Sequence, residues 1–153
     1  MKKKIVCLFF ILMLFGLTGL SAQMNKTQLQ NMYLNHLRSE GYTPTVDSDG
    51  DVNFTAQGQR FYIDVIDDDL SSFHLVLSGF LDIGAASNRL KALDAASAVT
   101  RTTKVVRVYI TSSNRIAIDT FIFLAKPDDF KLHLNRMINI MVAAREEFLS
   151  MMK

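Results

Sequence analysis

Apolar residues follow two different spacings along this chain, and the changes between them predict the order of helices and strands. Residues 25–40 carry apolar side chains at intervals of three and four, which predicts an amphipathic helix ending before Gly41. Its apolar stripe is formed by Leu29, Met32, Tyr33 and Leu37. Residues 42–46 then predict a short extended piece, which Pro44 favours at a sheet edge.

Strict alternation of apolar and polar side chains follows. It predicts a hairpin over residues 51–66 with one apolar face, formed by Val52, Phe54, Ala56, Phe61, Ile63 and Val65. Another strand is expected over residues 73–81, with Phe73, Leu75 and Leu77 on one face. Its other face would carry His74, Val76, Ser78 and Phe80, and is apolar enough to be partly covered.

A second helix, rich in alanine, is predicted over residues 84–100, where small side chains allow close approach to a neighbouring element. Leu90 and Leu93 are its larger apolar residues. The clearest hairpin comes next, because β-branched residues alternate along residues 106–110 and 116–122. A three-residue loop places Ile110 opposite Ile116, Val108 opposite Ile118, and Arg107 opposite Asp119.

The last helix is predicted to start near Pro127, with acidic residues in its first turn. It carries a long apolar stripe formed by Phe130, Leu134, Met137, Ile138, Met141, Val142, Phe148 and Leu149. A stripe of this kind packs on its own domain, or, being rich in methionine, offers an adaptable binding surface. The predicted order α-β-β-β-β-α-β-β-α indicates an α+β fold, an antiparallel sheet with helices packed on it.

Residues 1–22 have the three parts of a secretory signal peptide: Lys2 to Lys4, an uncharged run from Ile5 to Leu20, and a small residue at Ala22. The run is shorter than the roughly 20 residues of a membrane span. We therefore expect cleavage after Ala22, no stable membrane span, and a single domain over residues 23–153 in the periplasm or outside the cell. A retained membrane anchor is the alternative.

Removal of this leader changes the composition of the chain. It takes away Cys7, the only cysteine, and so excludes disulfides and thiol nucleophiles from the mature domain. It also takes three of the 17 basic residues, leaving 14 against 15 acidic ones, a net charge near −1. A nearly neutral domain has no electrostatic basis for binding nucleic acid.

Few residues of the sequence suggest a catalytic or metal-binding role. Asp47, Asp49 and Asp51 form an acidic turn that could hold calcium weakly, but the glycine and glutamate positions of an EF-hand are not matched. The three histidines lie in separate elements, and no nucleophile motif or phosphate-binding loop is present. We therefore expect no enzyme, no catalytic residue, no cofactor, and no metal site beyond this calcium candidate.

Tyr109, Phe121 and Phe123 lie on the side of the last hairpin where a one-sided sheet should be polar. They are therefore our candidate protein-contact surface, for an unidentified protein partner or a second copy of the chain in a homodimer. A small-ligand or calcium-binding protein of the cell envelope is the alternative function.

Four segments carry a family resemblance: LRSEGY at residues 37–42, DGDVNF at 49–54, GQRFYI at 58–63, and TKVVRVYI at 103–110. With the helices around them, they make residues 27–150 similar to the YbjN-like family, proposed sensory-transduction regulators of bacteria. The resemblance implies a two-layer sandwich like that of type III secretion chaperones and a tendency to bind proteins. It supplies no catalytic residues, and those relatives are commonly cytoplasmic, whereas this chain carries an export leader.

Overall fold

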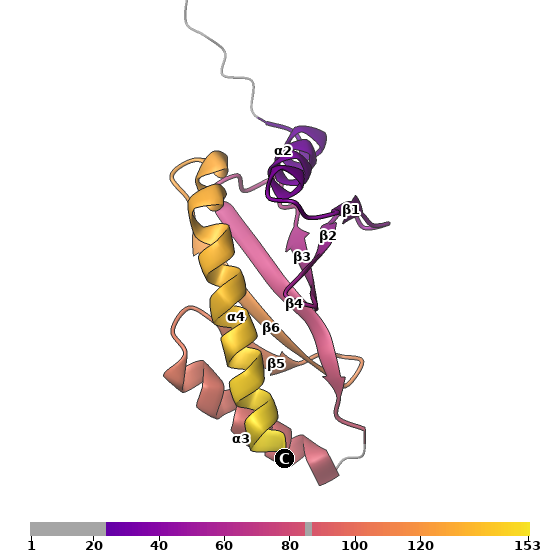
Figure 1. Cartoon of the computed structure of the whole chain (residues 1–153), viewed down its shortest axis with the longest axis vertical. Coiled ribbons are helices and arrows are strands. Elements are labelled where there is room, and N and C mark those ends of the chain that lie inside the picture. Colours follow the sequence, from indigo (N-terminus) through magenta and orange to yellow (C-terminus); the bar gives the residue numbers. More distant parts are fainter. Residues whose placement is uncertain (1–23, 85–86) are drawn as a thin grey trace, which may run out of the picture.

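The computed structural model describes residues 24–84 and 87–153, and the predicted leader at residues 1–22 lies outside these ranges. The elements appear in the predicted order (Figure 1). They are α2 (Lys26–Ser39), β1 (Thr45–Val46), β2 (Val52–Ala56), β3 (Gln59–Asp64), β4 (Ser72–Asp82), α3 (Ser87–Thr102), β5 (Arg107–Ile110), β6 (Arg115–Phe123), a short 3₁₀ turn (Pro127–Asp129) and α4 (Phe130–Met152).

The strands form one six-stranded antiparallel sheet in the order β1-β2-β3-β4-β6-β5. In the last hairpin, Ile110 pairs with Ile116, Val108 with Ile118, and Arg107 with Asp119. The register predicted from the alternating β-branched residues is therefore confirmed. It holds because a slip by one residue would move every apolar side chain of the strand to the other face.

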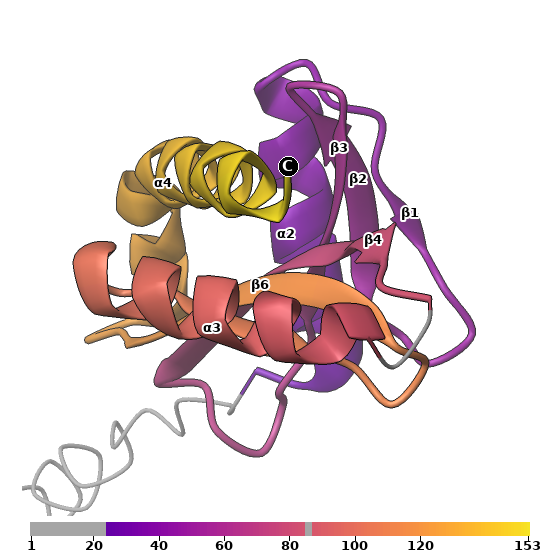
Figure 2. The same cartoon turned by 90° about the horizontal axis from the view of Figure 1, so that it is seen from below.

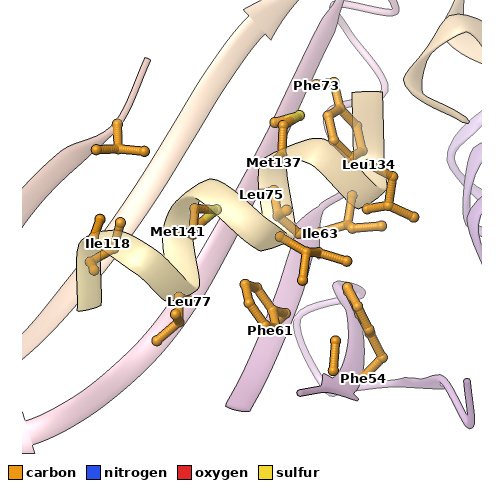
Figure 3. Close-up of a cluster of buried hydrophobic side chains, with 14 of the residues drawn as sticks. Phe54, Phe61, Ile63, Phe73, Leu75, Leu77, Ile118, Leu134, Met137 and Met141 are labelled. Atoms are coloured by element: carbon orange, nitrogen blue, oxygen red, sulfur yellow. The ribbon is translucent and has the colours of Figure 1, made fainter. Parts of the chain in front are cut away.

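The three helices of the described ranges, α2, α3 and α4, pack on one face of this sheet, which makes a two-layer α+β sandwich (Figures 1 and 2). Alternate strand residues such as Phe61, Ile63, Leu75 and Ile118 meet the buried stripe of α4 (Figure 3). That stripe contains Phe130, Leu134, Met137, Ile138, Met141, Ala144 and Phe148, so it belongs to the core. Within the described ranges, no helix has the combination of length and apolar content needed to cross a membrane.

Residues suited to helix ends stand at both ends of α2. Asn25 and Gln28 form a capping box, in which each side chain accepts the other's backbone N–H, at 3.0 and 2.9 Å. At the far end, Gly41 has a φ of 86°, and the N–H of Tyr42 donates to the carbonyl of Leu37 at 3.0 Å. The predicted stop at Gly41 is confirmed, because this left-handed conformation favours glycine.

Helix α3 packs through its small residues, Ala92, Ala95, Ala96 and Val99, which are all buried. The two leucines do not join this face: Leu90 is 69% exposed and Leu93 is 46% exposed. Alanine at the contact allows α3 to approach α4 and β5 closely, and the larger side chains are left facing outward.

A bulge in β4 overturns one prediction. The pairing with β6 shifts between Leu77 and Leu81, so the alternation predicted through residue 80 is interrupted. As a result, Phe80 lies on the helix side, edge-on to Phe148 with 5.9 Å between ring centroids, and not beside Val76 as predicted. Gly79 marks the bulge, because a Cβ there would lie 2.9 Å from the Cβ of Arg115.

Strand β5 is shorter than β6 and covers only part of its edge (Figure 1). It pairs with β6 from Ile116 to Asp119, whereas the stretch from Thr120 to Phe123 pairs with β4 alone among the described strands. The end of β6 therefore has one free edge, bordered by the connection from α3 to β5.

Candidate functional site

The face of the sheet that lies away from the helices carries the candidate site, and we call it the open face. Its side chains come from alternate positions of the four strands β3, β4, β6 and β5, outside the main core. They include Tyr62, Asp64, His74, Val76, Arg107, Tyr109, Ala117, Asp119, Phe121 and Phe123. Val76 and Ala117 are buried even here, so the larger neighbours shield the middle of this face.

A network of charged groups occupies one end of the open face. The His74 ring lies between two carboxylates, with Nδ1 3.3 Å from Asp64 Oδ2 and Nε2 3.2 Å from Asp119 Oδ2. Arg107 donates to both oxygens of Asp119, with Nε 3.1 Å from Oδ1 and Nη2 on Oδ2. Asp119 is only 3% exposed, so its charge is held by these two partners.

The network shifts the pKa values of its members in opposite directions. Burial disfavours the charged form of Asp119, but the hydrogen bonds from His74 and Arg107 outweigh it and hold the pKa of this carboxyl below its usual value. The hydrogen bond to Asp119, helped by Asp64 against partial burial, raises the pKa of His74 above 6.5. The ion pair of protonated His74 with ionised Asp119 is therefore stabilised.

The raised pKa of His74 predicts that stability declines as pH rises. The protonated ring stabilises the fold fully below its ordinary pKa of 6.5, and this contribution is lost as pH rises through the higher pKa of the folded protein. Urea unfolding at a series of pH values from about 5.5 to 8.5 should show the decline in the wild type and a flatter profile in His74→Gln. An equal decline in both proteins would contradict this assignment. Replacing His133, which is exposed on α4, by glutamine serves as the control.

Two phenylalanines extend from the charged network into solvent. Phe121 is 48% exposed and Phe123 is 78% exposed, and their rings meet edge-on with centroids 5.5 Å apart. Phe121 also contacts the His74 ring, at 5.6 Å between centroids. Tyr109, the third predicted contact residue, lies half-buried on β5 beneath the guanidinium of Arg107, which is 5.1 Å from its ring centre.

The structure thus places the three predicted residues on one face, with Arg107 and Asp119 between Tyr109 and the phenylalanine pair. A shallow cavity of about 480 Å³ borders this group, lined by Asp64, His74, Arg107, Asp119 and Phe121 among others. Both ring nitrogens of His74 face carboxylates, so neither is directed at a molecule in this cavity.

The acidic turn lies elsewhere, between β1 and β2. Asp47 Oδ1 accepts the backbone N–H groups of Asp49, Gly50 and Asp51, each at 3.0 Å. Asn53 donates to Asp47 Oδ2 at 2.7 Å, and with the backbone bonds it lowers the pKa of Asp47. These bonds give Asp47 a structural role in closing the turn.

The other two carboxylates of the turn differ in surroundings. Asp51 accepts the N–H of Val65 at 3.2 Å, whereas Asp49 is exposed. Across residues 24–84 and 87–153, no group of three or more His, Cys, Asp or Glu side chains is gathered closely enough to hold a metal ion. Calcium binding at this turn stays a prediction, which calorimetric titration with calcium would decide.

His74 and Asp64 are site residues that sequence reasoning did not select. His74 is separated from Asp119 by 45 positions, and the two meet only because β4 pairs with β6. The alternation along the strands could have indicated this group, because Asp64, His74 and Asp119 all occupy positions that face away from the core.

Two solved structures have a similar fold. YbjN from E. coli, a proposed transcription regulator, aligns with a TM-score of 0.54 and 11% identity, over 74% of this chain and 86% of YbjN. An uncharacterized protein from Methanothermobacter thermautotrophicus aligns with a TM-score of 0.57 and 13% identity, over 81% of this chain and 96% of that protein. No protein-family model matches the chain, and no curated protein matches it either. The chain therefore has the YbjN-like fold that its sequence resemblance implied.

Proposed function

We propose that this chain is an exported, non-enzymatic protein-binding module, and that its contact surface is the open face around Phe121 and Phe123. The observation that carries the proposal is the exposure of these two adjacent aromatic rings on β6, with the described helices on the other face of the sheet. Single exposed apolar residues are normal, but a contiguous aromatic pair beside fixed charges resembles the anchors of protein interfaces.

The neighbouring charged network supports a protein partner. Arg107 and Asp119 are fixed by a bidentate ion pair, and Arg107 also covers the Tyr109 ring. Arginine and tyrosine, with other aromatic residues, are enriched at the centres of interfaces because they give a large contact area and polar groups together. A partner that covers Phe123 would thus meet a rigid, partly charged platform.

The fold and the site together support a function without catalysis. Of the two proteins with a similar fold, YbjN is a proposed transcription regulator and the other is uncharacterized. On the open face, His74 is held between Asp64 and Asp119 at both ring nitrogens. An acid–base catalyst needs a nitrogen within reach of its substrate. Export is supported by the signal-peptide pattern of residues 1–22.

Removing the exposed ring of Phe123 should abolish partner capture. The chain is tagged at its C-terminus, expressed in its native organism, cross-linked and purified from the envelope fraction. The co-purified proteins are then compared by mass spectrometry. Phe123→Ser should lower recovery of the specific partner at least about tenfold, because an aromatic anchor contributes about 2 kcal/mol or more. Leu132→Ser on α4 is the matched control, since Leu132 is 79% exposed against 78% for Phe123.

Each result has a clear meaning. A partner that is retained by Leu132→Ser but lost from Phe123→Ser supports the open face, and if that partner is the chain itself, light scattering should show a dimer that Phe123→Ser dissociates. A partner retained equally by both variants would overturn the proposed surface. Both variants change exposed side chains, so their unfolding midpoints should stay close to that of the wild type.

A further inference from the structure

A second cavity, of about 630 Å³, lies on the helix side of the sheet and shares Val105 and Thr120 with the cavity beside Phe121. Neither Phe121 nor Phe123 lines it. It is formed where the end of α3 and the connection to β5 meet β6 and the first half of α4, elements that can be followed in Figure 1. Its size falls in the range of sites for small organic molecules.

The rim of this cavity carries basic side chains. Lys104 comes from the α3–β5 connection, and His133 and Arg136 come from α4. In the part of the chain that the structure describes, none of these three side chains has an ion-pair or hydrogen-bond partner. The carboxylate of Glu147 is close to the end of α3, but it accepts from the hydroxyls of Thr102 and Thr103, at 3.1 and 3.4 Å, and does not line the cavity.

The wall of the cavity contains a buried hydroxyl without a partner. Thr120 is 2% exposed, lines the cavity, and its Oγ1 has no hydrogen-bond partner within the described ranges. It lies on the stretch of β6 that β5 leaves uncovered. A buried hydroxyl with no partner is unfavourable for folding, and a ligand oxygen that reached it would remove this cost.

The remaining lining is apolar, and one part of it is strained. Ile122 from β6 and Met137 and Ile140 from α4 give a continuous apolar strip. Val105, on the opposite side, has a φ of 66°, a left-handed conformation that is rare for a β-branched residue. Backbone strain of this kind is concentrated at ligand sites, where it fixes the shape of a wall.

We propose that this cavity binds a carboxylate that carries an apolar chain, as in a fatty acid. The carboxylate would be bound by Arg136 and Lys104, with the Thr120 hydroxyl donating to one of its oxygens. The apolar chain would lie along Ile122, Met137 and Ile140. The pairing of a cationic rim with an apolar strip selects this class, because an uncharged alcohol leaves the cations unmatched and a short carboxylate leaves the strip empty.

Titration of the purified chain with decanoate tests the proposal, and decanol and acetate are the comparison ligands. Decanoate should bind at concentrations below about 1 mM, with decanol at least tenfold weaker and acetate without measurable binding. Arg136→Gln should weaken decanoate binding about tenfold, since it removes one charge-assisted bond. The matched control is Arg38→Gln, an exposed arginine at the end of α2. Equal binding of decanol and decanoate, or no effect of Arg136→Gln, would overturn the proposal.

Thr120→Val separates a ligand role from a purely structural one. The substitution keeps the shape of the side chain and removes the unpaired hydroxyl, so the melting temperature of the free protein should rise. Decanoate binding should weaken at the same time, because the hydroxyl no longer donates to the carboxylate. Thr55→Val, at an exposed position of β2 that does not line this cavity, is the control and should leave decanoate binding unchanged. Undiminished binding to Thr120→Val would remove the hydroxyl from the site.

Discussion

Replacing Phe130 by alanine is expected to lower the free energy of unfolding by about 4 kcal/mol, the largest effect of any substitution considered for this protein. The ring is fully buried at the first residue of α4 and joins elements that are far apart in sequence. Its centroid lies 4.9 Å from Tyr33 and 5.1 Å from His36 on α2, and 5.3 Å from Phe73 on β4. Alanine would leave a cavity where two helices meet the sheet, because three surrounding rings limit how far the site can collapse.

Urea unfolding, followed by far-ultraviolet circular dichroism and by tyrosine fluorescence, measures this loss. Leu132→Ala, two residues further along the same helix and 79% exposed, is the control and should change stability by less than about 0.5 kcal/mol. A loss below about 2 kcal/mol for Phe130→Ala would show that the aromatic group does not fix α4 against α2.

Replacing Asp119 by alanine is expected to cost about 3 kcal/mol at neutral pH. The substitution removes the acceptor shared by His74 and Arg107 and leaves the His74 ring, 17% exposed, with Asp64 as its remaining partner. Arg107 loses less, because its side chain is 68% exposed and water can solvate the freed guanidinium. Most of the cost therefore comes from the histidine side of the network.

The stability cost of Asp119→Ala should depend on pH. Because the pKa of Asp119 is lowered in the folded protein, its contribution is present above its ordinary value of 3.8 and is lost as pH falls through the folded value. The difference between wild type and Asp119→Ala should therefore shrink in strong acid. Asp68→Ala, an exposed loop carboxylate, is the control. A double-mutant cycle with His74→Ala should show a larger coupling than one with Arg107→Ala, and the reverse order would contradict this distribution.

The elements predictable from sequence were those whose signals are local. The register of β5 and β6 followed from alternating β-branched residues and the charges at Arg107 and Asp119, all within one hairpin. The extent of α2 followed from its helical spacing of apolar residues and from Gly41 at its end. The apolar stripe of α4 also predicted which side of the helix is buried, because its apolar residues recur at helical spacing along its whole length.

Features that depend on distant segments were not predictable in the same way. The bulge in β4 comes from how β4 meets Arg115 on β6, so the strand's own alternation placed Phe80 on the wrong face. The outward position of Leu90 and Leu93 follows from the alanine contacts of α3 with α4 and β5. The network of Asp64, His74, Asp119 and Arg107 needs four strands in register, and no local pattern sets that.

The candidate surface was predictable in part. Phe121, Phe123 and Tyr109 were chosen because apolar residues lay on a face expected to be polar, and the structure places them together on that face. The charged group beside them, and the second cavity with Thr120 in its wall, arise from segments that meet only in three dimensions.

Because β5 pairs with only part of β6, it also affects how this protein behaves at high concentration. From Thr120 to Phe123, β6 pairs with β4 alone among the described strands and carries the exposed Phe121 and Phe123, and such an edge is a template on which another chain can add a strand. Lys104 and the strained turn at Val105 lie beside this edge and impede a flat, regular approach. We therefore expect the edge to be the first point of self-association at high concentration, and occupation of the open face to protect the protein from aggregation.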